Sequence, residues 1–222
     1  IRQAAYEFER MRKRILRHLN QRSEMLSGIS HDLRTPLTRL KLQLAFLKNN
    51  KIANKMSEDI DEMEKMLNAY LEFSSSQQEI KNEIIDLNLL IKKIILNYKD
   101  KHITLSGEEN LKINGRNIAI KRCLINLIDN SLIYGKKVEI LLKKSLTGAI
   151  IIVDDDGPGV PEKERENVFK PFYRIDESRG QNKSGVGLGL SITNDIIRSH
   201  GGNIALSTSP RNGLRVKISL PF

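Results

Sequence analysis

Apolar residues recur at intervals of three and four between residues 26 and 47, at Leu26, Ile29, Leu33, Leu37, Leu40, Leu44 and Leu47. This spacing predicts a long amphipathic helix, because side chains three and four positions apart lie on one helix face. At about 100° per residue, His31 points roughly opposite Ile29 and Leu33, so we expect an exposed imidazole. Thr35 follows His31 by one turn and shares its face. The neighbouring Asp32 can hydrogen-bond one ring nitrogen and leave the other free to attack.

The residues on either side extend this helix into a hairpin. Residues 1–24 keep the same spacing and can form one rod with the His31 helix, which we expect to bend at Pro36. Polar residues 48–51 predict a turn, and a second helix follows with apolar residues at Ile52, Met56, Ile60, Met63, Leu67 and Tyr70. A hairpin this thin cannot bury both apolar stripes alone, so we expect a four-helix homodimer. The polar stretch 74–78 predicts a linker and a domain boundary.

The composition limits the classes of protein to which the chain can belong. Its 222 residues, 39% hydrophobic and 29% charged, indicate a soluble globular protein of one or two domains. No apolar run approaches the roughly 18 residues that cross a bilayer, and no secretory signal is visible. The single cysteine, Cys123, excludes an intrachain disulfide and fits a reducing cytosol. Because the first residue is Ile1 rather than Met, we expect the chain to be cut from something longer.

The net charge of +10 raises the question of a nucleic-acid partner. The sequence has only 5% aromatic residues and no zinc-type clusters, which argues against a surface that stacks on nucleic-acid bases. Much of the positive charge lies near the start, at Arg10, Arg12, Lys13, Arg14, Arg17 and Arg22. A basic segment beside a membrane and a merely solvated helix face explain this charge equally well.

The second half of the chain alternates between helical and strand patterns. Helices are predicted at about 86–96, 117–134, 161–169 and 187–200, the first of them capped by Asp86 or Asn88. Strands are predicted at about 102–105, 111–113, 138–145, 148–154, 203–208 and 214–220. The polar loop 173–186 is too long for a simple connection and suggests a lid. This pattern predicts an α/β sandwich with helices on one face of a mixed sheet.

The helix predicted at 117–134 carries the first stretch with chemical potential. Asn126, Asn130 and Tyr134 recur every four residues on one of its faces. Two amide side chains on one face can offer carbonyl oxygens to Mg²⁺, which otherwise keeps water and phosphate ligands. For the two asparagines taken alone, a polar solvated face is the simpler explanation.

Glycines accompany the other two candidate stretches. Asp155 ends an apolar strand and is followed by Gly157 and Gly159, so its carboxylate can accept from an amino group while the backbone approaches a ligand. A plain acidic turn is the alternative. The glycine-rich residues 184–190 precede a helix, whose free N–H groups can hold phosphate. They match neither a Walker loop nor a Rossmann fingerprint.

Two sets of motifs carry a family resemblance. The string from His31 to Leu37, His-Asp-Leu-Arg-Thr-Pro-Leu, resembles the phosphoacceptor box of sensor histidine kinases. The three stretches within residues 84–222, in this order, resemble the ATP-binding domain shared by histidine kinases, Hsp90-type chaperones, gyrase-type topoisomerases and MutL-type repair proteins. The whole chain is similar to the cytoplasmic part of EnvZ-type osmolarity sensors.

This resemblance implies roles for individual residues. His31 would be the phosphoacceptor, Asp32 would orient its imidazole, and Thr35 would help position water for dephosphorylation of the regulator. Asn130 would bind Mg²⁺, with Asn126 as a candidate second ligand. Asp155 would accept a hydrogen bond from the adenine amino group of ATP. The ATP pocket would also include Tyr134, Gly157, Gly159, Phe169, Phe172, Arg174, Gly185, Val186, Gly187, Leu188 and Gly189.

The resemblance also implies an organisation and an activity. Residues 1–24 would be a signalling helix, 25–78 the dimerisation and histidine phosphotransfer domain, and 79–222 the catalytic ATP-binding domain. The hairpin would form a dimeric four-helix bundle, and the chain would be a MgATP-dependent histidine kinase that phosphorylates and dephosphorylates an aspartate of a response regulator. It would be the cytoplasmic part of a bacterial inner-membrane sensor, without a nucleic-acid partner, and would meet the membrane only through segments missing from this chain.

Two departures from the family pattern keep alternatives open. Ser131 and Ile133 stand where many members have Ala and a Lys or Arg, and Ile133 cannot pair with phosphate. Phosphate contacts would then come from Lys136, Lys137, Arg174 or the lid. A degenerate kinase that serves as a dimer scaffold or phosphatase is one alternative. A chaperone- or topoisomerase-type ATPase without histidine chemistry is the other.

Overall fold

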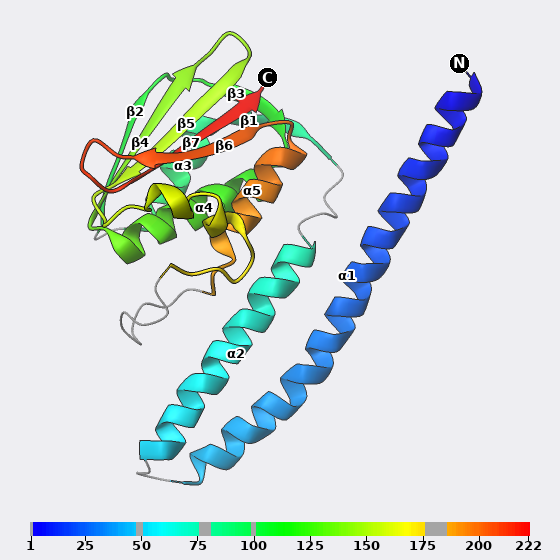
Figure 1. Ribbon diagram of the computed structural model, residues 1–222, viewed down its shortest axis with the longest axis vertical. Coiled ribbons are helices and arrows are strands. Elements are labelled where there is room, and N and C mark those ends of the chain that lie inside the picture. Colours follow the sequence, from blue (N-terminus) through cyan, green and yellow to red (C-terminus); the bar gives the residue numbers. More distant parts are fainter. Residues whose placement is uncertain (1, 48–50, 76–80, 99–100, 176–185) are drawn as a thin grey trace. The chain divides into compact units, whose positions relative to one another are not determined.

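The computed structural model describes residues 2–47, 51–75, 81–98, 101–175 and 186–222, and within α1 the side chain of His31 is outside the described part. The chain divides into two compact units, Ile1–Glu79 and Ile80–Phe222. The first unit is helical, and the second carries all the strands that the structure describes (Figure 1).

The long helix α1 (Arg2–Ala45) runs without interruption past Gly28, which confirms the predicted rod. It also continues through Pro36 and curves in the half that contains this residue (Figure 1). Pro36 has no N–H to donate to the carbonyl four residues earlier, which permits such curvature. One turn further on, the Thr38 hydroxyl donates to the Arg34 carbonyl at 2.9 Å.

The second helix, α2 (Lys51–Ser75), confirms the predicted hairpin. The predicted turn falls on residues 48–50, which lie outside the described residues, and Lys51 already belongs to the helix. The predicted linker starts too early, because Ser74 and Ser75 are helical. Neither glycine nor proline is present there to end the helix. Residues 76–78 of that linker lie outside the described part of the chain.

The apolar residues of the hairpin form two seams with seven-residue spacing. The inner seam consists of half-buried Leu37 and Leu44 of α1 and buried Ala53 and Ile60 of α2. Across it, Lys41 forms ion pairs with acidic residues of α2. The outer seam stays exposed, with Leu33 and Leu40 at 46%, Met56 at 48% and Met63 at 55%. Among the described residues, one hairpin therefore leaves a large part of the predicted apolar surface exposed.

The second unit is built on a five-stranded sheet in the order β2-β4-β5-β7-β6. The strands are β2 (His102–Gly107), β4 (Lys137–Lys144), β5 (Gly148–Asp155), β6 (Asn203–Thr208) and β7 (Leu214–Pro221). The β2–β4 pair is parallel and the other pairs are antiparallel, so the predicted mixed sheet is confirmed.

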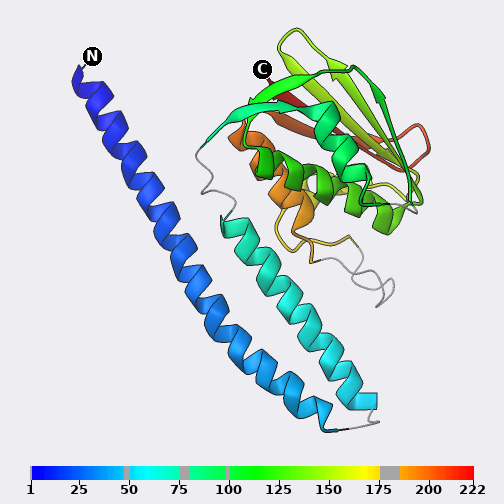
Figure 2. The same ribbon diagram turned by 180° about the vertical axis from the view of Figure 1, so that it is seen from behind.

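Three helices cover one face of this sheet, as predicted (Figure 2). They are α3 (Leu87–Ile95), α4 (Asn117–Tyr134) and α5 (Gly189–Ser199). Asp86 caps α3 by accepting the Leu89 N–H at 3.0 Å, so of the two predicted caps Asp86 is the one used. The buried side of α4 contains the residues predicted to pack on the sheet, Ile120, Leu124, Leu127, Ile128 and Ser131.

Three elements differ from the predictions. A short strand, β1 (Glu83–Asp86), pairs with β3 (Lys112–Gly115) and was not predicted, because four residues carry too little periodicity. The helix predicted at 161–169 is replaced by two short 3₁₀ turns, η1 (Glu162–Glu164) and η2 (Asn167–Phe169). Val168 is the one buried residue of these two turns, so no apolar stripe holds an α-helix there. Helix α5 begins two residues later than predicted, because Gly187 has a φ of +75°.

His200, directly after α5, links that helix to the start of α4. Its Nδ1 lies 2.7 Å from the Ile196 carbonyl, and its Nε2 accepts the backbone N–H of Arg116 at 3.0 Å. A carbonyl only accepts and a backbone N–H only donates, so both bonds require the neutral imidazole with its proton on Nδ1. Burial lowers the pKa of His200. The hydrogen bond with the Ile196 carbonyl raises this pKa, and the charge of the Arg116 guanidinium lowers it further.

We expect His200 to make the stability of the second unit depend on pH. Because the pKa of His200 is lower in the folded chain, the unfolded chain binds a proton at this residue more readily. The contribution of neutral His200 to the free energy of unfolding is therefore complete above the ordinary pKa of 6.5. It is lost as the pH falls towards the lowered pKa of the folded chain. The check is thermal unfolding of the parent and of His200→Gln across about pH 5 to 8. The advantage of the parent should shrink as the pH falls, and a constant difference would contradict the expectation.

Candidate functional site

Asp155 stands at the end of β5, where it is 3% exposed. Its Oδ1 accepts two backbone N–H groups, from Gly157 and from Leu214, both at 2.9 Å. The approach is close, because a Cβ atom on Gly213 would lie 2.4 Å from this oxygen. Both of these backbone donors go to Oδ1, so Oδ2 is the oxygen that can accept from a ligand.

The electrostatics of Asp155 set it apart from a surface carboxylate. Burial raises the pKa of Asp155, the Leu214 and Gly157 N–H groups lower it, the charge of Asp156 raises it, and the Ser131 hydroxyl lowers it. The groups that hold this carboxylate are neutral donors rather than a cation. A buried acidic group with a perturbed pKa beside glycine-rich backbone is a candidate for ligand recognition.

Helix α4 brings the two asparagines to the same end of the unit. Asn126 is half-buried, and its Nδ2 donates to the Gly189 carbonyl at 3.4 Å. With its amide nitrogen directed there, its carbonyl oxygen is available to a cation or a donor. Asn130 is half-buried one turn further on, and Tyr134 at the end of α4 is exposed. A Cβ on Gly157 would lie 3.1 Å from the Tyr134 carbonyl, so the end of α4 touches the loop after β5.

The start of α5 adds backbone donors to this region. The first turn of a helix has N–H groups without an acceptor inside the helix, and its dipole favours negative charge. Gly187 precedes it with a φ of +75°, and a Cβ there would lie 2.9 Å from the Phe172 backbone. The Gly187 carbonyl accepts the Phe172 N–H at 3.0 Å, so the two ends of the predicted lid are joined at this point.

The predicted residues of the second unit fall into two groups. Seven take part in the contacts given above, which join Asn126 with Gly189, Gly157 with Asp155 and Tyr134, and Phe172 with Gly187. Near them in the chain lie Asn130, Gly159, Phe169, Arg174, Val186 and Leu188, of which Leu188 is buried and the others are half-buried. Gly185 lies outside the described residues.

The site residues predicted in the first unit lie on α1. Asp32 and Thr35 are exposed there, as expected for the face that follows His31. A hollow of about 520 Å³ is lined by Thr35 together with Arg34, Thr38, Arg39 and Leu42. Thr35 therefore borders a concave part of the helix surface.

The sequence did not reveal the residues that fix Asp155 from β7 and the turn before it. Ser209 is buried, donates its hydroxyl to the Asp155 carbonyl at 2.7 Å, and accepts the Gly213 N–H at 3.0 Å. Leu214 supplies one of the two N–H groups to the carboxylate. The stretch 209–213 connects two predicted strands, and nothing in its composition indicates which distant strand lies beside it.

The side-chain oxygen atoms on α4 suit a magnesium ion that is also bound by phosphate. Among the described residues no group of three or more His, Cys, Asp or Glu side chains could hold a metal by itself. Mg²⁺ typically keeps several waters and binds through one or two protein oxygens plus substrate phosphates. The asparagine oxygens of α4, next to the anion-attracting start of α5, fit that kind of site.

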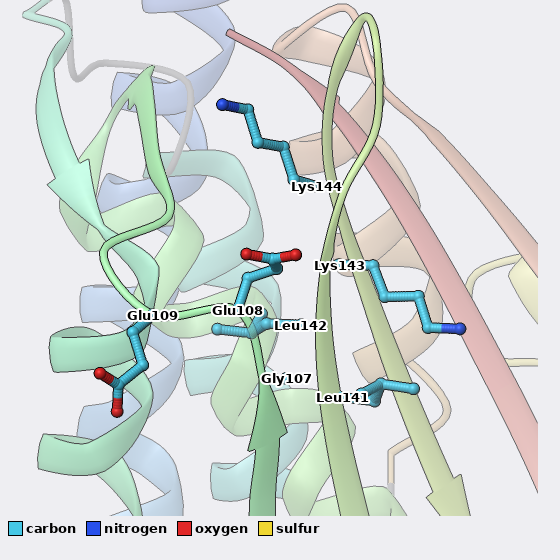
Figure 3. Close-up of a pocket in the computed structure, with 7 residues that line it drawn as sticks. All are labelled: Gly107, Glu108, Glu109, Leu141, Leu142, Lys143 and Lys144. Atoms are coloured by element: carbon cyan, nitrogen blue, oxygen red, sulfur yellow. The ribbon is translucent and has the colours of Figure 1, made fainter.

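A separate hollow lies away from these residues, at the ends of β2 and β4 (Figure 3). It measures about 580 Å³ and is lined by Gly107, Glu108, Glu109, Leu141, Leu142, Lys143 and Lys144. Two glutamates and two lysines are among its lining residues, and none of the predicted site residues lines it. This hollow is not the nucleotide site that the motifs predict.

The described helices include none that is long and apolar enough to cross a membrane. Residues 21–79 match the His Kinase A (phospho-acceptor) domain, and residues 115–222 match the histidine kinase-, DNA gyrase B-, and HSP90-like ATPase family. These two matches cover the second half of α1, all of α2 and most of the α/β unit.

Comparison with known proteins extends the likeness to nearly the whole chain. The sensor histidine kinase GtrS of Pseudomonas aeruginosa is 39% identical over 99% of this chain and 46% of its own length. The sensor histidine kinase CpxA of Escherichia coli is 35% identical over 99% of this chain and 51% of its own length. The chain therefore spans about half the length of these curated relatives.

A solved structure supports the fold of the second unit. The ATP-binding domain of PrrB from Mycobacterium tuberculosis superimposes with a TM-score of 0.53, at 27% identity, over 64% of this chain and 97% of that one. The helical hairpin, the α/β unit with its glycine-rich ends, and these matches together place the chain in a single family. The chain belongs to the sensor histidine kinases, with a His Kinase A domain followed by a histidine kinase-like ATPase domain.

Proposed function

We propose that this chain transfers the γ-phosphoryl group of ATP to His31 and then to an aspartate of a response regulator. The observation that carries the proposal is the meeting of Asp155, the asparagine face of α4 and the start of α5 at one end of the second unit. This arrangement offers an acceptor for an amino group, oxygens for a cation and donors for phosphates. Such a set suits a nucleoside triphosphate with an amino-bearing base.

The residues of this site divide the nucleotide among them. Asp155 accepts from the adenine amino group through Oδ2, while its Oδ1 stays on the backbone of Gly157 and Leu214. The backbone N–H groups at the start of α5 bind the phosphates. Asn130 would hold Mg²⁺, with Asn126 as a candidate second ligand, and the bound cation would supply charge neutralisation for phosphoryl transfer. Ile133 offers no cation, so Lys136, Lys137, Arg174 and the lid supply the remaining positive charge.

The chemistry on α1 follows from an imidazole beside a carboxylate. A nitrogen of His31 attacks the γ-phosphorus in line, a nitrogen–phosphorus bond forms, and the bond to the bridging oxygen of ADP breaks. Asp32 hydrogen-bonds the other ring nitrogen and takes its proton as positive charge develops on the ring. The phosphoryl group then passes from the histidine to a carboxylate oxygen of the regulator.

The exposed outer seam of the hairpin supports a homodimeric arrangement. Leu33 and Leu40 of α1, with Met56 and Met63 of α2, repeat at the seven-residue spacing of a helical bundle. A second copy of the hairpin would cover them and complete four helices. Within this dimer, residues 1–24 act as a signalling helix, 25–78 as the phosphotransfer domain and 79–222 as the catalytic domain. The string around His31 also supports a likeness to the EnvZ-type sensors, and we propose that the chain is the cytoplasmic part of a bacterial inner-membrane protein.

The test is to locate the phosphorylated residue by mass spectrometry after reaction with MgATP. Phosphate on His31, labile to acid and stable to base, is the expected result. A chaperone- or topoisomerase-type ATPase would hydrolyse ATP and leave the protein unlabelled. A degenerate scaffold would fail to bind ATP in a titration, so the two alternatives give different outcomes.

Thr35 is expected to serve dephosphorylation of the regulator rather than phosphorylation of His31. Its hydroxyl lies one turn from His31 on an exposed helix face, where it can hold a water molecule against a docked phospho-aspartate. Thr35→Ala should keep most autophosphorylation and phosphotransfer but lose most phosphatase activity. The helix should persist, because alanine is the better helix former. The measurement is decay of purified phosphorylated regulator with this variant and ADP, and decay at the parental rate would refute the role.

A further inference from the structure

Asp156 follows Asp155, the carboxylate that accepts from the nucleobase in the proposed function. Its side chain connects the end of β5 with the α4–β4 connection and with β4. Its Oδ1 accepts the backbone N–H of Lys136 at 2.6 Å and that of Lys137 at 2.9 Å. Lys136 lies between α4 and β4, and Lys137 opens β4. One carboxylate oxygen directly after β5 therefore holds both the connection that follows α4 and the start of β4.

The surrounding backbone leaves little freedom to this arrangement. A Cβ on Gly135, the residue that ends α4, would lie 2.7 Å from the Asp156 Oδ1 and 3.1 Å from the Gly157 nitrogen. The same Gly157 donates its N–H to Asp155. The β4–β5 ladder ends at the pair Val138 and Asp155, directly before these contacts. The position of the Asp155 carboxylate thus depends on a loop that Asp156 fastens to α4.

The Asp156 carboxylate is ionised under ordinary conditions. The backbone N–H groups of Lys137 and Lys136 lower its pKa, in that order of effect. The Asp156 carboxylate accepts its hydrogen bonds from backbone N–H groups, so this geometry needs an acceptor oxygen at residue 156 rather than a negative charge. An asparagine at this position retains such an oxygen, whereas an alanine does not.

We propose that Asp156 is a positioning residue for nucleobase recognition: by fastening the α4–β4 connection to the end of β5, it holds the Oδ2 atom of Asp155 where an adenine amino group can reach it. This inference rests on the proposed function, because it takes Asp155 as the acceptor for the base. It adds that selectivity for an amino-bearing base depends on a residue that makes no contact with the base.

The experiment compares two nucleotides on the full chain. ATP carries the amino group, and purine riboside triphosphate has hydrogen in its place. Dissociation constants for both are measured by titration with the parent, Asp156→Ala, Asp156→Asn and the control Glu162→Ala, which removes an exposed carboxylate of η1. Circular dichroism establishes the temperature range in which every variant is folded.

The parent should prefer ATP over the analogue. Asp156→Ala should weaken ATP binding roughly tenfold and leave analogue binding unchanged, since only the hydrogen bond to the amino group is misplaced. Asp156→Asn should restore the preference, and Glu162→Ala should behave as the parent.

Two results would overturn the role of Asp156. Equal weakening of both nucleotides by the alanine variant would indicate a structural effect without selectivity, and an unchanged preference would remove the role altogether. A parent that binds both nucleotides equally would instead refute Asp155 as the acceptor for the base. That outcome would overturn the proposed nucleotide site, and the positioning role with it.

Discussion

Replacing His31 with glutamine is expected to abolish transfer of label from ATP to the protein while ATP binding persists. Glutamine is similar in size and polar, but its amide nitrogen is not a nucleophile at neutral pH. The residues proposed to hold ATP belong to the second unit, and the first of them along the chain, Asn126, comes more than ninety residues after His31 in the sequence. The substitution should therefore remove the acceptor without touching the nucleotide. The measurements are label incorporation and an ATP titration on the same preparation.

A matched control for this variant is His102→Gln. His102 is exposed, opens β2 and matches no proposed functional position. The His102→Gln variant should incorporate label from ATP to the same extent as the parent. Label retained by His31→Gln would move the phosphoacceptor elsewhere, and loss of ATP binding in that variant would contradict the separation of the two roles.

Asp155→Asn is expected to weaken ATP binding by about 1–3 kcal/mol, the usual cost of leaving a buried polar group unpaired. In the parent, the Gly157 and Leu214 N–H groups occupy Oδ1. The asparagine oxygen can replace Oδ1 in these bonds, so the amide NH₂ then points where Oδ2 was. The amide NH₂ of the variant and the adenine amino group are then two donors that face each other, so the hydrogen bond between residue 155 and adenine is lost. The measurement is the ATP dissociation constant, with thermal unfolding to confirm the fold.

The neighbouring Asp154 provides the control for this prediction. Asp154 is also buried, but it alternates to the other face of β5, where Arg215 binds both of its oxygens at 2.7 Å. Asp154→Asn removes the charge of one partner of a partly buried ion pair and should lower stability more than it lowers ATP affinity. If both variants lost ATP affinity equally, the effect of Asp155→Asn would be one of folding rather than of recognition.

The sequence predicts the main helices and strands because their periods are long and regular. Helix α4 shows this most clearly, since Leu124 and Leu127 on its buried side and Asn126 and Asn130 on the other were separated by period alone. Strand β1 and the 3₁₀ turns were missed or wrongly assigned, because each is only three or four residues long. Such short elements are stabilised by their neighbours and not by their own pattern.

The candidate site was predictable where one segment supplies both the residue and its context. Asp155 with Gly157 is such a case, and so is the glycine-rich start of α5. The partners of Asp155 were not predictable, because Ser209 and Leu214 come from segments more than fifty residues away in the chain. The two hydrogen bonds that the backbone N–H groups of Lys136 and Lys137 donate to Asp156 were also missed, because the register of β4 against β5 decides them.

The place of β7 in the sheet bears on how the chain is made. It is the last described strand in sequence, yet it lies inside the sheet between β5 and β6. A nascent chain that has reached Gly213 therefore presents two open strand edges, one of them on the Ile- and Val-rich β5, and self-association competes with closure. Synthesis of residues 214–221 joins these edges and delivers the Leu214 N–H to Asp155 in the same event. A chain that stops before Leu214 should be captured by chaperones or proteases as an unfolded polypeptide, rather than persist as a domain with weakened affinity.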